Sequence, residues 1–336
     1  MRSVTLALSG AAMVALLAGC SESNQGTQTA SIPSEASHLS APIPQGTPIP
    51  KPAKKPARPG WLSPPAQSGP LMYVADDGGE VYIYPESGYN QSPIGMITSG
   101  INGTWGLYVD QNGNLYAANT GNNTVTVYPP GSIDPSATYS QDLNRPLYPI
   151  VDGSGNLWVS NANNGTVVEY RAGSTNPYQV LQTLGVEADG MDFDQQGNLY
   201  VAYRTTDGVD SIEKFIPGST QGQTLGMTLN QPQGVIVDRR GNVLAVETGG
   251  PTKRRIDDVL VFSPGANTPK FTLKLPKGAV PNQLAITADE SLLFVASWTN
   301  GAVYVTGYPL RKRSSWTVLD DVQGAYGIAL SNGQVF

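Results

Sequence analysis

Residues 106–119 read GLYVDQNGNLYAAN, and copies of this stretch recur through most of the chain. The further copies begin at Pro149, Gly190, Gly234, Leu284 and Ile328. Equivalent positions, from Asp110 in the first copy to Ser331 in the last, lie 42, 42, 44, 49 and 44 residues apart. A repeat of this length is typical of a small structural unit that packs against its neighbours.

One repeat contains the signals for four β-strands. A short apolar run ends at Asp110, and the Asp-x-x-Gly-Asn sequence that follows predicts a tight turn, because the carboxylate can accept backbone N–H bonds and the glycine can adopt positive φ. Residues 115–119 and the β-branched residues 124–128 predict the next two strands. Pro130-Gly131 predicts a turn before a more variable fourth strand. No helical periodicity competes, so the sequence predicts an all-β fold.

The number of strands predicts how the ends of the chain meet. First strands lie near residues 106, 148, 190, 234, 284 and 328, and sets of the other three strands begin near residues 71, 115, 157, 199, 243 and 293. The three-strand set that begins near residue 71 has no first strand before it. The first strand near residue 328 has almost nothing after it. We therefore expect a six-bladed β-propeller of four-stranded antiparallel blades over residues 69–336, closed by the C-terminal strand joining the first blade.

The start of the chain has the three parts of a bacterial export signal. Arg2 supplies the positive charge, an apolar run follows, and small residues precede Cys20. The run is too short to cross about 30 Å of hydrocarbon with margin, so we expect residues 1–19 to be a signal peptide. Leu17–Cys20 resembles the lipobox of bacterial lipoproteins, which implies that Cys20 carries the lipid. The alternative is a soluble export signal with an incidental cysteine.

Residues 20–68 predict a lipidated, disordered tether. They are rich in Ser, Pro, Gln, Thr and Ala, with almost no large apolar residue before Trp61. Such a segment cannot bury enough surface to offset its ordering entropy. Its Pro-rich centre, residues 48–59, carries four positive charges. One interpretation is that these charges contact anionic lipid or cell-wall polymer. The alternative is that they only keep the spacer soluble and extended.

Charge and composition exclude several functions. Residues 61–336 have 15 Lys and Arg against 24 Asp and Glu, which argues against a nucleic-acid partner. Cys20 is the only cysteine and His38, in the tether, the only histidine. The propeller therefore has no residue for a disulfide, a thiol nucleophile or a histidine base.

The repeats resemble the NHL and YVTN type of six-bladed propeller, within the TolB-like group that also holds the senescence-marker-protein/gluconolactonase enzymes. The motif that carries this resemblance is Asp-x-x-Gly-Asn-Leu-Tyr-Val-Ala-Asn, and it covers residues 70–336. The resemblance implies that ligands sit over the central channel, on the face where the first strand of each blade begins. The residues at those positions are Trp105, Leu147, Asp189, Gln233, Asn282 and Tyr326.

Two of these positions look like metal ligands of the gluconolactonase family. Asp189-Gly190-Met191 and Pro281-Asn282 are similar to the turns that supply them, and an oxygen-rich ring could hold calcium. The pattern breaks at the Trp, Leu and Tyr positions of the ring, where further oxygen ligands would be needed. The alternative is that Asp189 and Asn282 only cap turns.

We therefore expect a cell-envelope lipoprotein whose propeller is a non-catalytic binding platform for a protein or glycan. The protein would be attached to a membrane through its N-terminal lipid, with the propeller outside the cytoplasm, in the outer membrane or periplasm where there are two membranes. The expected binding residues at the channel mouth are Trp105, Asp189, Gln233, Asn282 and Tyr326. No cofactor is expected. The alternative is a calcium-dependent lactonase or esterase that uses Asp189 and Asn282 as metal ligands.

Overall fold

A computed structural model of the protein describes residues 60–63, 69–76, 79–86, 92–249, 257–319 and 325–333. The predicted signal peptide, Cys20 and most of the predicted tether lie outside the described residues. All regular elements in the described part are β-strands. No helix long and apolar enough to span a membrane is found there.

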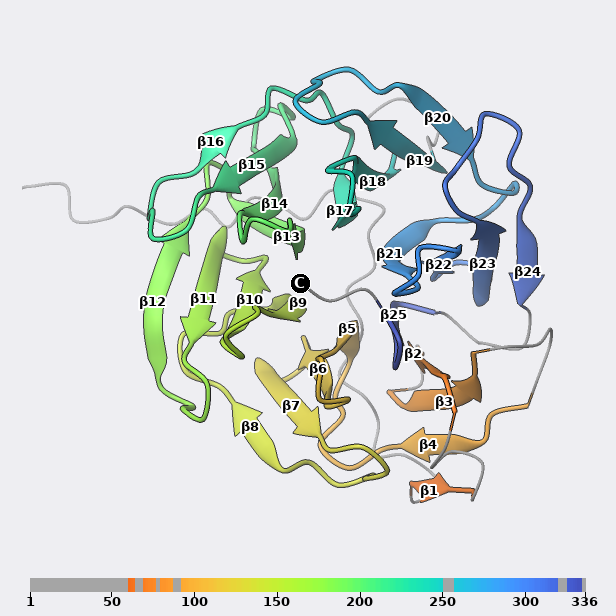
Figure 1. The fold of residues 1–336 in the computed structure, drawn as a ribbon. Helices are drawn as coiled ribbons and strands as arrows, with labels where there is room; N and C mark the ends of the chain where they lie inside the picture. The colour runs from red at the N-terminus through yellow and green to blue at the C-terminus, as the bar shows by residue number, and fades with distance from the viewer. Residues whose placement is uncertain are drawn as a thin grey trace, which may run out of the picture. The chain divides into compact units, whose positions relative to one another are not determined.

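The strands form six antiparallel sheets around a common centre (Figure 1). Blade 1 contains β1 (Trp61–Leu62), β2 (Leu71–Ala75), β3 (Val81–Pro85), β4 (Gly95–Ile97) and β25 (Gly327–Leu330). Blade 2 contains β5 (Thr104–Val109), β6 (Leu115–Asn119), β7 (Thr124–Tyr128) and β8 (Ala137–Tyr139). Blade 3 contains β9 (Pro146–Val151), β10 (Leu157–Asn161), β11 (Thr166–Tyr170) and β12 (Pro177–Gln182). Blade 4 contains β13 (Glu187–Phe193), β14 (Leu199–Arg204), β15 (Ser211–Phe215) and β16 (Gln223–Thr224). Blade 5 contains β17 (Pro232–Val237), β18 (Val243–Thr248), β19 (Asp257–Phe262) and β20 (Phe271–Lys274). Blade 6 contains β21 (Pro281–Ile286), β22 (Leu292–Ser297), β23 (Ala302–Gly307) and β24 (Thr317–Leu319).

The inner strands line the centre of the ring. They are β5, β9, β13, β17, β21 and β25, and each contacts its neighbours on either side. Apolar clusters fill the spaces between adjacent blades, as where Ala118 and Val125 of blade 2 pack with Val159 and Val168 of blade 3. The core is thus distributed around the ring. This arrangement is a six-bladed β-propeller, which confirms the predicted fold class.

The two ends of the described chain meet in blade 1. β25 pairs antiparallel with β2, and the register places Ile328 opposite Val74. Both side chains are buried, at 1% and 0% exposure, in the apolar cluster between blades 6 and 1. The predicted closure by the C-terminal strand is therefore confirmed.

Blade 1 has a fifth strand that the sequence did not predict. β1 pairs with the outer edge of β4, with Trp61 opposite Met96. Leu62 packs against the cluster between blades 1 and 2. Trp61 and Leu62 supply the large apolar side chains of this strand. The predicted tether, which extended to residue 68, therefore contains two residues that form a strand.

The repeated Asp-x-x-Gly-Asn turns form as predicted. Asp110 Oδ1 accepts the backbone N–H groups of Asn112 and Asn114 at 2.8 Å each, and Gly113 has φ of 81°. The aromatic residue in the next strand adds a bond, because the hydroxyl of Tyr116 donates to Asp110 Oδ2 at 3.3 Å. The motif therefore joins the turn to the strand that follows it.

Removing all residues after Gln323 deletes β25 and leaves the edge of β2 unpaired. We expect the shortened protein to lose its cooperative melt, or to melt far below the full chain, because ring closure and the buried contacts of Ile328 are lost together. Circular dichroism melting curves check this. A full-length midpoint in the shortened protein would contradict the role given to β25.

Candidate functional site

The six residues at the start of the inner strands converge on one end of the channel, called the mouth here, but they are buried. They are Trp105, Leu147, Asp189, Gln233, Asn282 and Tyr326. Their exposed fractions range from 0% to 4%. The rings of Trp105 and Tyr326 lie 5.4 Å apart, and Asn282 Nδ2 donates to the backbone oxygen of Tyr326 at 2.5 Å. The expected aromatic pair therefore exists, but as part of the core rather than as an open surface.

Glycine sets how closely the inner strands approach. In four blades the residue after the mouth position is glycine, as at Gly106 and Gly190. A Cβ atom on Gly106 would lie 2.2 Å from the backbone oxygen of Leu147, and one on Gly190 would lie 2.1 Å from that of Gln233. Any side chain there would force neighbouring blades apart.

The two blades without this glycine lie opposite each other, and their side chains fill the channel. The hydroxyl of Tyr148 in blade 3 lies 2.9 Å from both the backbone and side-chain oxygens of Asn282 in blade 6. Gln283 Oε1 accepts the N–H groups of Leu107 and Ile328 at 3.0 Å each. Tyr148 and Gln283 therefore bridge the ring, and the sequence signal for them is the break in the glycine pattern.

Little space is left beyond these two bridges. The cavity bounded by Tyr108, Asp192 and Gln283 measures about 70 Å³, which fits a few waters. Burial raises the pKa of Asp192 to about 7, although its bonds from the N–H groups of Val237 and Phe193 act in the opposite direction. The channel beside Tyr148 and Gln283 is therefore narrow.

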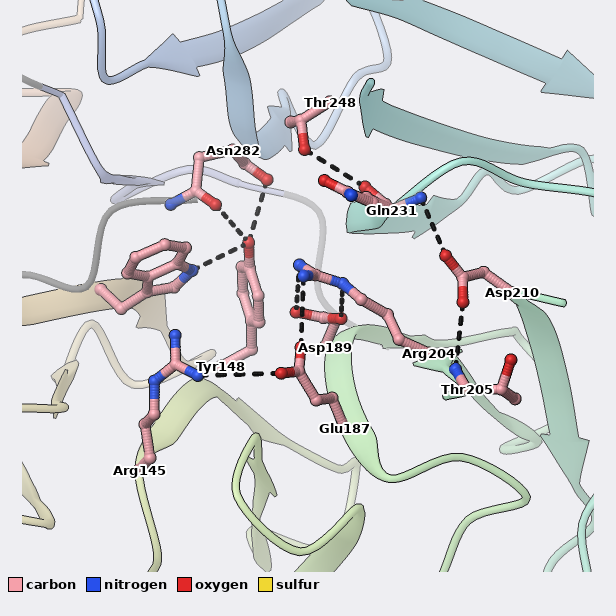
Figure 2. Close-up of polar contacts among 11 residues, drawn as sticks. Arg145, Tyr148, Glu187, Asp189, Arg204, Thr205, Asp210, Gln231, Thr248 and Asn282 are labelled. Atoms are coloured by element: carbon pink, nitrogen blue, oxygen red, sulfur yellow. Dashed lines mark hydrogen bonds and ion pairs between the residues drawn. The ribbon is translucent and has the colours of Figure 1, made fainter. Parts of the chain in front are cut away.

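A buried ion cluster from blades 3 and 4 lies beside Tyr148 (Figure 2). Arg204 Nε is 2.8 Å from Asp189 Oδ2, and its Nη2 donates to Asp189 Oδ1 at 3.2 Å. Arg204 Nη1 is 3.2 Å from Glu187 Oε2, and Arg145 Nη1 is 3.9 Å from Glu187 Oε1. These four side chains are at most 7% exposed. Two positive and two negative charges therefore alternate in the cluster, and three of the four residues were not predicted.

The two arginines are not equally well paired. Burial acts to lower the pKa of Arg204, but the carboxylates of Asp189 and Glu187 raise it overall. Burial lowers the pKa of Arg145, against the effect of Glu187. Burial also raises the pKa of Asp189, because the carboxylate loses its water, while Arg204 opposes this change. Arg204 and Asp189 form the tight pair, and Arg145 is the less compensated charge.

Some polar atoms at the mouth have no partner. Gln233 is 1% exposed, and neither its Oε1 nor its Nε2 has a hydrogen-bond partner among the described residues. Arg145 Nε likewise has none there. Arg145 also has φ of 59°, in the left-handed region that costs a non-glycine residue free energy. Unpaired buried atoms and backbone strain thus occur together at one end of the channel.

An aromatic residue that sequence reasoning missed reaches toward the surface. Trp298 is half-buried and stacks on Tyr326, with ring centroids 6.3 Å apart and an interplanar angle of 10°. Tyr326 in turn contacts Trp105. The partly exposed ring at this mouth is therefore Trp298, which follows β22, while the predicted pair lies beneath it.

The donor set at the mouth fits a cation poorly. Both carboxylate oxygens of Asp189 contact Arg204, and Asn282 Oδ1 lies within bonding distance of the Tyr148 hydroxyl. No group of three or more Asp, Glu, His or Cys residues that could hold a metal occurs among the described residues. Calcium prefers six to eight oxygen ligands, so Asp189 and Asn282 would need several more.

Comparisons with known proteins agree on the architecture. No family model matches the chain, and no curated protein matches it. A chain from the crystal structure of the nidogen/laminin complex is similar with a TM-score of 0.63 and 16% identity, covering 79% of this chain and 100% of its own. A chain of Kuenenia stuttgartiensis hydrazine synthase is similar with a TM-score of 0.58 and 11% identity, covering 85% and 92%. The likeness is one of fold. At these identities it carries no activity or partner over to this protein.

Replacing Arg204 with methionine leaves Asp189 and Glu187 buried with Arg145 as the remaining cation of the cluster. We expect a loss of about 3 to 5 kcal/mol in the free energy of unfolding at pH 7, because an uncompensated buried charge is costly. Burial raises the pKa of Asp189 to about 7, and the variant loses the opposing effect of Arg204. The folded pKa of Asp189 then lies above its unfolded value, so stability falls as pH rises from about 4 through 7. Denaturant unfolding of Arg204→Met and wild type at pH 5 and pH 8 should therefore show the larger deficit at pH 8.

The matched control is Arg171→Met. Arg171 Nε is 3.5 Å from Glu169 Oε1, and the Arg171 side chain is 51% exposed. We expect a change below about 1 kcal/mol, as for other exposed ion pairs. Equal losses in the two variants would show that the buried cluster has no special role in stability.

The prediction of calcium at Asp189 and Asn282 can be tested directly. Since Arg204 occupies the Asp189 carboxylate, we expect the melting midpoint of the full chain to be the same in millimolar calcium and in chelator. A ligand at about 100 times its dissociation constant would add about 2.7 kcal/mol, a visible shift. A calcium-dependent rise that Asp189→Ala abolishes would instead support the metal-dependent hydrolase.

Proposed function

We propose that this protein is a cell-envelope lipoprotein whose propeller is a non-catalytic binding platform for a protein or glycan partner. A lipid on Cys20 holds the chain at a membrane, with the propeller outside the cytoplasm. The support for this attachment is the tripartite start of the sequence and the lipobox-like Leu17–Cys20. Two or more acyl chains are enough for stable attachment, where one is marginal.

The chemistry of the mouth favours binding over catalysis. A general acid or base must reach the substrate and exchange a proton with it. The carboxylates of Glu187 and Asp189 are instead at most 6% exposed and are held by Arg204. The chain's one histidine, His38, precedes the propeller.

The observation that carries the proposal is the unpaired amide of Gln233. A buried polar group without a partner costs about 1 to 3 kcal/mol, and most such groups in proteins are paired. The amide can donate and accept at once, so it suits a peptide group, an amide or a hydroxyl of a partner. Arg145 Nε adds a donor at the same end of the channel, and Trp298 adds a flat apolar ring.

A protruding group of the partner then reaches the amide of Gln233, which is 1% exposed, by displacing the side chains that cover it. The channel beyond is closed by Tyr148, so the group would reach the ring of mouth residues and stop there. The remainder of the partner would lie on the surrounding loops of this face.

Replacing Gln233 with leucine tests this proposal, because it removes the unpaired amide at nearly constant volume. We expect the variant to melt at the wild-type midpoint or above it, since the amide of Gln233 has no hydrogen-bond partner among the described residues. Its capture of envelope components should fall at least about tenfold, the effect of roughly 1.4 kcal/mol. Immobilised full-length protein, exposed separately to envelope proteins and to soluble cell-wall glycans, measures that capture.

The control is Gln221→Leu, which changes an exposed glutamine of blade 4. It should capture the same components as wild type. The fraction that binds wild type and the control but not Gln233→Leu identifies the partner as protein or glycan. Undiminished capture by Gln233→Leu would mean that the mouth is not the binding surface.

A further inference from the structure

The outer strand of blade 3 differs from those of the other blades. β12 has six residues, whereas the outer strands β4, β8, β16, β20 and β24 have two to four. β12 ends its sheet, so no described strand pairs with its outer edge. A long free edge presents a row of N–H and C=O groups, which is a template for another strand.

The side chains along this edge are uncharged, and several of the exposed ones are apolar. Tyr178 is 57% exposed and Val180 is 45% exposed. Leu184, two residues beyond the strand, is 58% exposed. Proteins usually protect such an edge with charged residues or proline, but β12 has no charged residue and has proline only at its first position, Pro177.

The strand is held in place before any partner arrives. Leu181 is 1% exposed and packs in the cluster between blades 3 and 4. Gln179 Nε2 donates to Glu169 Oε2 at 2.5 Å, and the guanidinium of Arg171 lies 3.6 Å from the ring centroid of Tyr178. Little ordering entropy is therefore lost when a second strand pairs with this edge.

The molecule already extends one blade in this way. β1 pairs antiparallel with the outer edge of β4 through Trp61 and Leu62. An outer edge of this propeller can therefore take an additional strand without changing the blade. In blade 3 the described residues supply no such strand.

We infer that β12 pairs antiparallel with β12 of a second copy of this chain, about a two-fold axis at Val180. The sheets of the two copies of blade 3 then form one continuous sheet. In this register Val180 faces Val180 of the second copy, Tyr178 faces Gln182, and Gln179 faces Leu181. An interface of this kind uses the same patch on both copies, as most homodimers do.

The sequence of the strand favours a second copy over an unrelated partner. A two-fold pair places each residue opposite its mirror position, so a charged strand would often oppose like charges. β12 avoids this because it is uncharged, although the whole chain has a net charge of −6. Its central residue is β-branched, which suits a cross-strand pair with itself.

The contact is small, so the dimer should be weak. Six residues extend about 20 Å, and an interface built on one strand pair is below the size of most stable complexes. The test must therefore detect a weak association or trap it. A cysteine at the two-fold axis does so, because directly opposed residues of paired strands have Cα atoms about 4.5 to 5.5 Å apart, within the range of a disulfide.

The experiment uses the full chain with Val180→Cys, incubated with oxidised glutathione and examined on a non-reducing gel. We expect a disulfide-linked dimer at least about tenfold above the level of wild type, which has only Cys20. The matched control is Val209→Cys, whose position is 64% exposed and lies in the turn after β14. Equal cross-linking of Val209→Cys and Val180→Cys, or none in either, would overturn the inference.

Sedimentation of unmodified protein supplies the second measurement. The average mass of wild type should rise with concentration toward two chains, while Val180→Lys stays at one chain because two lysines meet at the axis. Val209→Lys should behave as wild type, and all three proteins should share one melting midpoint. A wild-type mass of one chain throughout, or a rise unaffected by Val180→Lys, would also overturn the inference.

Discussion

The close approach of the six inner strands is the constraint on which the rest of the molecule depends. At Gly106 and Gly190 the backbone of the next blade occupies the place where a side chain would begin. The ring can be this narrow only because those positions lack a Cβ atom. Tyr148 and Gln283, on opposite blades, then fill the centre and bond across it. The same constraint narrows the channel.

The mouth combines well-satisfied and poorly satisfied polar groups. Arg204 pairs with both Asp189 and Glu187, so its charge is compensated. Arg145 and Gln233 retain polar atoms that no described residue bonds, and Arg145 also has a strained backbone. Buried ion pairs add little net stability compared with apolar residues of the same size. Stability is therefore given up at one place, beside one end of the channel.

The sequence predicted those features that depend on local chemistry. The turn at Asp110 involves residues four apart, and the closure of the ring followed from counting strands. The state of the mouth could not be predicted in the same way. Tyr148 and Asn282 are 134 residues apart, and the depth at which Trp105 lies depends on how tightly the blades pack. Arg204 lies at the far end of the neighbouring strand, and nothing in the repeat marks it as the partner of Asp189.

Blade 1 joins two structural roles, since it receives the N-terminal segment through β1 and holds the closure between β2 and β25. In a protein attached at its N-terminus, any pull on the propeller arrives at β1 first. β1 is short: Trp61 and Leu62 pair with β4, and the N–H and hydroxyl of the neighbouring Ser63 donate to the backbone oxygen of Ile94. The pairs between β2 and β25 would be loaded only afterwards. In a protein held through Cys20, as proposed, the short pairing of β1 would therefore be loaded before the strand pairs that close the ring.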